Sequence, residues 1–133
     1  MPAMNPTARW FVVLGALSAA ASVAIGAAAA HVHDPELAAR LPLVDTALRY
    51  HQLHAIGLIV AGLLARDGAG RWLIAAGALF VAGTLLFSVN LYLRAFAGFD
   101  ALRGWVPLGG GAFIVGWIAL AVAAWRTRTS PPR

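Results

Sequence analysis

A tyrosine, two histidines and a glutamine lie at the start of a stretch that continues as apolar sequence, YHQLHAIGL at residues 50–58. His51 and His54 are three residues apart and Tyr50 and His54 are four apart, so on a helix His54 shares a face with both. Neutral imidazoles bind zinc, copper or haem iron, and they also donate, accept and relay protons. Polar groups at membrane depth must face a partner or a cavity, and they often mark a functional site. These residues are therefore the first candidates for chemistry.

Further polar or small residues recur toward the same ends of the apolar blocks. They are His31 and His33 in the first block, Ser88, Asn90 and Tyr92 in the third, and Pro107, Gly109 and Gly110 in the fourth. If successive spans alternate in direction, all of these positions meet the 50–54 segment in one leaflet. We therefore predict a polar cleft in the external leaflet. We expect His31 rather than His33 to point inward, and Asn90 to cap carbonyl groups or bond across helices.

Four interpretations of these residues remain open. First, His31, His51 and His54 bind a metal ion or haem. Second, the histidines and Tyr50 relay protons or bind a small polar solute or headgroup. Third, they contact a larger membrane complex of which this chain is an accessory subunit. Fourth, they only pack at the interface, where such rings are common and where Trp10, Trp72, Trp105 and Trp125 are expected to be anchors.

The sequence does not favour an enzyme. Ser88 lacks the context of a nucleophile elbow, and no carboxylate lies deep enough in an apolar block to orient a base. Hydrolysis is therefore the least favoured chemistry, and we expect a protein that is not an enzyme.

The composition is that of a membrane protein. Of the 133 residues, 61% are hydrophobic and 11% are charged, which is far from the balance of a soluble domain. A helix needs about 20 apolar residues to cross the hydrocarbon core. We predict one domain over residues 1–133 with four spans, at about 9–31, 46–65, 72–93 and 107–125, and a mobile tail at 126–133. The first block is longer than the core of a cleaved signal peptide, so we expect it to remain as a span.

The predicted fold class is all-α, an antiparallel up-down four-helix transmembrane bundle. The first external loop should contain a short interfacial helix, because Asp34, Pro35 and Glu36 have the order of an N-cap, a first helical residue and a first-turn acid. We expect Pro42 to end that helix and Asp45 to cap the second span.

Small residues form a stripe along the first apolar block. They are Gly15, Ala19, Ser22, Gly26 and Ala30, spaced by three or four residues. Such a stripe lets a neighbouring helix approach closely, which drives association where lipid removes the hydrophobic effect between helices. We expect Gly77, Gly83 and Gly116 to serve close packing in the same way.

The charges indicate an orientation. The net charge of +5 comes from ten arginines without lysine. Six of them lie on the side that carries both termini and four on the other, so we predict a multi-pass inner-membrane protein with both termini cytoplasmic. The arginines are scattered at span ends, which favours membrane lipids as partners, leaves a membrane-protein partner or a homo-oligomer open, and excludes nucleic acid.

Five ordered motifs give the chain a family resemblance. GAAAAH (26–31), YHQLHAIGL (50–58), FSVNLYL (87–93), VPLGG (106–110) and GW (116–117) resemble the YgdD-like small inner-membrane proteins, a domain of unknown function grouped with the eukaryotic small transmembrane protein 256. The resemblance implies a four-span helical membrane protein with signature positions at His31, Tyr50, His51, His54, Ser88, Tyr92, Pro107, Gly109 and Gly110. Val89 and Asn90 depart from the small residues usual in that family. His33 and Gln52 match none of its signatures.

We therefore expect an integral membrane protein that binds a small polar ligand or a metal at a cleft lined by histidine and tyrosine in the external leaflet. The alternative is an accessory or structural subunit in which the histidines only pack.

Overall fold

The computed structural model describes residues 4–126, and every regular element in that range is helical. The elements are α1 (Pro6–Ala30), α2 (Pro35–Ala38), α3 (Leu41–Leu64), α4 (Arg71–Gly83), the π-helix η1 (Thr84–Val89), α5 (Asn90–Ala97), the 3-10 helix η2 (Arg103–Trp105) and α6 (Val106–Arg126). α4, η1 and α5 follow one another without a break and form a single rod. The predicted all-α class is confirmed, while the predicted tail lies, from residue 127 on, outside the described residues.

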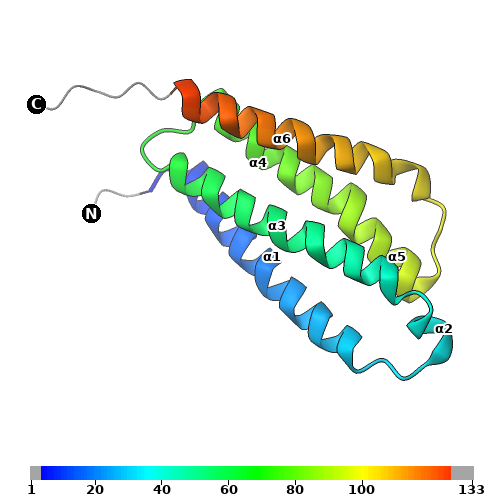
Figure 1. Cartoon of the computed structure of the whole chain (residues 1–133). Helices are drawn as coiled ribbons and strands as arrows, with labels where there is room; N and C mark the ends of the chain where they lie inside the picture. Colours follow the sequence, from blue (N-terminus) through cyan, green and yellow to red (C-terminus); the bar gives the residue numbers. More distant parts are fainter. Residues whose placement is uncertain (1–3, 127–133) are drawn as a thin grey trace, which may run out of the picture.

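The long helices run back and forth, so α1 begins and α6 ends at the same end of the molecule (Figure 1). α1 packs chiefly on α3, and α4 packs chiefly on α6. α3 also contacts α4, η1 and α5, so it is the central element of the fold. α2 lies at the opposite end, in the connection between α1 and α3 (Figure 1).

Three helical stretches in the described range are long and apolar enough to cross a membrane, namely Pro6–Ala30, Arg71–Ala97 and Arg103–Arg126. α3 is not among them, although it is 24 residues long. It carries Asp45, Arg49 and the polar run at 50–54, which lower its mean hydropathy.

The start of α3 differs from the prediction. The helix begins at Leu41, so Pro42 lies in its first turn instead of ending α2, and Asp45 lies inside it instead of capping it. Proline is tolerated there because the first N–H groups of a helix have no intrahelical acceptor. The start of α2 is as predicted, since the Asp34 side chain accepts a hydrogen bond from the Leu37 N–H at 2.8 Å.

Close packing explains the small residues. A Cβ atom at Gly15 would lie 2.8 Å from the Ala55 carbonyl oxygen of α3, so this member of the predicted stripe allows α1 to pack closely on α3. At Gly116 a Cβ would lie 2.8 Å from the Phe80 ring. Gly15 therefore lets the backbones of α1 and α3 approach closely, and Gly116 makes room for the Phe80 ring.

The buried apolar residues form two clusters. One lies toward the end where α6 terminates and includes Ala61, Phe80 and Phe113. The other is built around Val44 of α3 and Leu91 of α5. The polar residues of α3 lie between the two.

Candidate functional site

His51 and His54 form a polar layer between the two apolar clusters. Their side chains are 5% and 2% exposed, whereas Tyr50, one position before His51, is 42% exposed. The His51 ring contacts the ring of Tyr92, which belongs to one cluster, and the His54 ring contacts Phe113, which belongs to the other. Both imidazoles thus lie inside the fold, on the face of α3 that their spacing in the sequence indicated.

His51 connects three helices through hydroxyl groups. Its Nε2 lies 2.8 Å from the Ser18 Oγ of α1, and its Nδ1 lies 3.1 Å from the Tyr92 hydroxyl of α5. A hydroxyl group both donates and accepts, so this arrangement satisfies either neutral tautomer of His51. Tyr92, one of the residues predicted to line the cleft, therefore contacts His51 directly, and Ser18 occupies the other ring nitrogen.

His54 is held in one tautomer by its partners. Its Nδ1 lies 2.6 Å from the Tyr50 carbonyl oxygen, which only accepts, so Nδ1 carries the proton. Its Nε2 accepts from the Trp117 indole N–H of α6 at 3.0 Å, so Nε2 carries none. The ring also stacks on Phe113 with centroids 3.4 Å apart and planes inclined by 10°. His54 is thus a neutral imidazole that joins α3 to α6.

We expect the bond between His54 and Trp117 to contribute about 1–2 kcal/mol of coupling to the stability of the fold. The measurement is a double-mutant cycle of His54→Phe and Trp117→Phe, followed by reversible unfolding in mixed micelles. A matched cycle of His54→Phe with Trp105→Phe provides the control. Trp105 is 52% exposed, so the effects of these two substitutions on the free energy of unfolding should simply add. If the effects of His54→Phe and Trp117→Phe also add, the two side chains are not coupled, and that result would contradict the predicted contribution of the bond.

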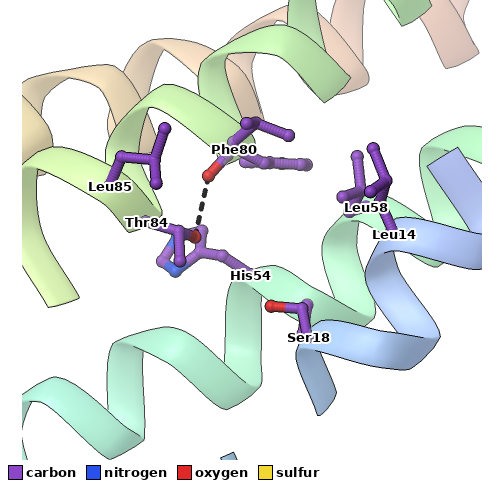
Figure 2. Close-up of a pocket in the computed structure, with 9 residues that line it drawn as sticks. Leu14, Ser18, His54, Leu58, Phe80, Thr84 and Leu85 are labelled. Carbon is purple, nitrogen blue, oxygen red and sulfur yellow. Dashed lines mark hydrogen bonds between the residues drawn. The ribbon is translucent and has the colours of Figure 1, made fainter. Parts of the chain in front are cut away.

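A cavity of about 170 Å³ opens between α1, α3 and the rod formed by α4 and η1. Its lining residues are Leu14, Ser18, His54, Ala55, Leu58, Phe80, Val81, Thr84 and Leu85. Figure 2 shows the Ser18 hydroxyl and the His54 ring at this cavity, and the Thr84 hydroxyl bonded to the Phe80 carbonyl oxygen, at 2.9 Å. Leu14 and Leu85 are 44% and 58% exposed, so the rim of the cavity faces outward.

The Thr84 and Leu85 wall of the cavity belongs to the π-helix η1. π-helical turns are rare in α-helices and occur frequently at functional sites. The cavity, with a π-helical wall and the Ser18, His54 and Thr84 side chains in its lining, is therefore a candidate functional site.

The other residues of the predicted cleft have separate roles. Ser88 is fully buried, and its Oγ has no partner within residues 4–126. The Asn90 side chain donates to the Leu102 carbonyl oxygen at 2.6 Å, as the predicted role in capping carbonyl groups required. Gly109 is buried against the η1 backbone, Gly110 lies beside the Phe87 ring, and Pro107 is exposed.

His31 does not join the histidine layer. α1 ends at Ala30, so His31 already lies in the turn and is exposed, as is His33, and the prediction that His31 points inward is wrong. Along α1, Ser18 is the residue opposite His51. Among residues 4–126 no group of three or more histidine, cysteine or carboxylate side chains is placed to hold a metal ion, so the structure does not bring His31, His51 and His54 together as ligands.

Two residues of the site were missed by sequence reasoning. Ser18 is a polar residue inside an apolar block, three residues after Gly15 and four before Ser22, so it follows the spacing of the small-residue stripe. Trp117 lies in the middle of its apolar block, whereas the predicted anchor tryptophans lie at block ends. An indole N–H in the middle of a span needs a hydrogen-bond acceptor inside the protein, and this requirement could have indicated that Trp117 pairs with a polar residue of another helix.

Comparisons with known proteins identify relatives of this chain. The family described as "Protein of unknown function (DUF423)" matches residues 25–110. The UPF0382 membrane protein YwdK of Bacillus subtilis is 39% identical over 116 residues, which is 86% of this chain and 94% of the relative. A UPF0382 membrane protein of Haemophilus influenzae is 35% identical over 127 residues, covering 90% and 96%.

The UPF0382 inner membrane protein YgdD of Escherichia coli is 29% identical over 126 residues, covering 92% of this chain and 94% of the relative. No solved structure gives a significant match.

Proposed function

The chain belongs to the DUF423 family, whose relatives named above are membrane proteins, and from that premise we propose a four-span inner-membrane protein that binds a small amphipathic molecule of the bilayer. The binding site in this proposal is the cavity between α1, α3 and η1. The protein acts as a binding protein and not as an enzyme.

The burial of its histidines supports α3 as the fourth span. A helix of 24 residues is about 36 Å long, which is enough to cross the hydrocarbon core. Hydropathy counts His51 and His54 as polar, but their ring nitrogens are bonded inside the chain, so they do not face lipid unpaired. Counted along the sequence, six arginines lie in the two terminal segments and the 66–71 loop, against four in the other two loops, and this bias favours cytoplasmic termini.

The observation that carries the binding proposal is the cavity itself. Its volume, about 170 Å³, is close to that of an engineered apolar cavity that binds benzene, so it has room for one ring or a short segment of chain. Its walls are mostly leucine, valine, alanine and phenylalanine. Because the exposed rim residues Leu14 and Leu85 face lipid in a span, the ligand enters from the bilayer.

The hydroxyl groups of the cavity define the polar part of the ligand. Thr84 already donates its hydrogen to the Phe80 carbonyl, so its oxygen is left to accept. His54 has no free nitrogen to offer. The ligand therefore combines an apolar body with a hydrogen-bond donor such as a hydroxyl or an amide N–H.

We expect 4-fluorophenol to bind the detergent-solubilised protein more tightly than fluorobenzene, because only the phenol donates a hydrogen bond to the cavity. The measurement is fluorine NMR line broadening at rising protein concentration. Val81→Phe fills the cavity and should abolish the broadening, whereas Val115→Phe, at a residue that is 52% exposed on α6, should preserve it. Equal broadening with both variants would assign the signal to the micelle and contradict the proposal.

The alternative function, an accessory subunit of a membrane complex, rests on the packing role of the histidines, since all four ring nitrogens of His51 and His54 have partners in the chain. Mild extraction of native membranes followed by size-exclusion chromatography distinguishes the two. A chain that always elutes alone would contradict the subunit function.

A further inference from the structure

Trp72, the second residue of α4, lies beside two arginines from different helices. The Arg71 guanidinium carbon lies 5.6 Å from the centre of the Trp72 ring, and the Arg126 guanidinium carbon, at the end of α6, lies 5.6 Å from it as well. Both distances are within the range of cation–π attraction. The indole thus holds two positive charges together at the end of the molecule where α1 begins.

Both arginines lie beside hollows in the surface. One hollow, of about 210 Å³, is lined by Arg126, Trp72, Gly68 and Gly70 above an apolar floor that includes Leu64. The other, of about 430 Å³, is lined by Arg71, Trp72 and Ala75. Trp72 is common to the two, so an occupant of either lies next to the indole and an arginine.

This end of the molecule also has donors without acceptors in the described range. The Trp72 Nε1 atom is buried and has no hydrogen-bond partner there. α4 begins at Arg71, and its N-cap residue Gly70 has no side chain to cap it, so the first backbone N–H groups of the helix have no side-chain acceptor at that position. The one ion pair within residues 4–126 joins Arg94 to Asp100, so neither Arg71 nor Arg126 is neutralised by a carboxylate there.

We propose that Arg71, Trp72 and Arg126 bind the phosphate of an anionic phospholipid headgroup. A guanidinium that stacks through its face keeps its edge N–H groups free, and these donate in pairs to phosphate oxygens. A tryptophan at the end of a span lies at headgroup depth, where such phosphates are found. In this proposal the headgroup lies in the hollows beside the arginines, and the apolar residues of the first hollow, such as Leu64, contact the start of the acyl chains.

The position of the site favours a lipid over a soluble anion. Basic pockets between transmembrane helices bind the headgroups of anionic lipids. Asp67, the nearest acid in the sequence, is exposed and makes no ion pair within the described range, so it does not compete for the guanidinium groups.

The test is native mass spectrometry of protein released from nanodiscs that contain equal amounts of phosphatidylglycerol and phosphatidylcholine. Wild-type protein should retain phosphatidylglycerol selectively. The variant Arg71→Gln/Arg126→Gln should bind it about thirty-fold more weakly, the magnitude expected for the loss of two interfacial arginines.

The matched control is Arg49→Gln/Arg103→Gln, which removes the same charge from two exposed arginines near the other end of the molecule. It should retain phosphatidylglycerol like the wild type. An equal loss in both double variants would overturn the proposal, because net charge alone would explain it. Displacement of the lipid by millimolar inorganic phosphate would also overturn it, because the site would then prefer a free anion.

Discussion

Replacing Gly109 with alanine should destabilise the fold by about 2–3 kcal/mol, whereas the same change at Gly111 should not destabilise it. A Cβ atom at Gly109 would lie 2.7 Å from the Phe87 backbone nitrogen and 2.9 Å from the Leu86 carbonyl carbon. Both atoms belong to the backbone of η1, so no change of side-chain rotamer relieves the overlap. At Gly111 nothing lies within 4 Å of the added Cβ.

The pair forms a sensitive comparison because the two glycines lie in the same helix and carry the same substitution. Alanine is favoured over glycine in a helix by about 1 kcal/mol, so Gly111→Ala is expected to raise the midpoint of thermal unfolding in detergent. Gly109→Ala should lower it, because the overlap exceeds that gain. Equal midpoints for the two variants would mean that α6 does not pack against η1 in the way described.

Replacing His51 with phenylalanine should cost about 2–3 kcal/mol of unfolding free energy, because two hydroxyl groups then lose their partner. Phenylalanine keeps a ring at this position but offers no nitrogen to Ser18 or Tyr92. The measurement is reversible unfolding in mixed micelles. His31→Phe is the control, and because His31 is exposed the change there should stay within about 0.5 kcal/mol.

A combined variant separates hydrogen bonding from ring packing. Adding Ser18→Ala and Tyr92→Phe to His51→Phe removes the hydroxyl groups that the single change leaves unpaired. When all partners of a buried hydrogen bond are replaced by apolar groups of similar shape, the free energy of unfolding often changes little. The triple variant should therefore be more stable than His51→Phe alone. A triple variant that is less stable than the single one would show that the rings, and not their hydrogen bonds, hold this layer.

Sequence reasoning identified much of the fold because lipid imposes simple rules. Long apolar blocks predicted three of the long helices, and small residues such as Gly15 predicted where α1 approaches α3. The start of α3 was placed too late, because Pro42 and Asp45 can each either end or begin a helix. Only packing at Leu41 and Val44 decides between these positions.

The candidate site was harder to predict because it depends on the register between helices. The spacing of His51 and His54 gave the face that they share, but it did not reveal that Ser18 and Trp117 would meet them. Those partners lie 33 and 63 positions away in the sequence. His31 was misplaced because α1 ends at Ala30, so the histidine lies in the exposed turn that follows the helix.

The π-helix η1 also determines which neighbour each half of its rod faces. Each group in a π-helix bonds five residues along instead of four, so the stretch holds one surplus residue, and the angular position of the residues that follow is set back by roughly 100° relative to a continuous α-helix. α4 can therefore face α6, where Phe80 meets Trp117, while α5 faces α3, where Tyr92 meets His51. One surplus residue in this rod thus sets the angle between the face of α4 that meets α6 and the face of α5 that meets α3.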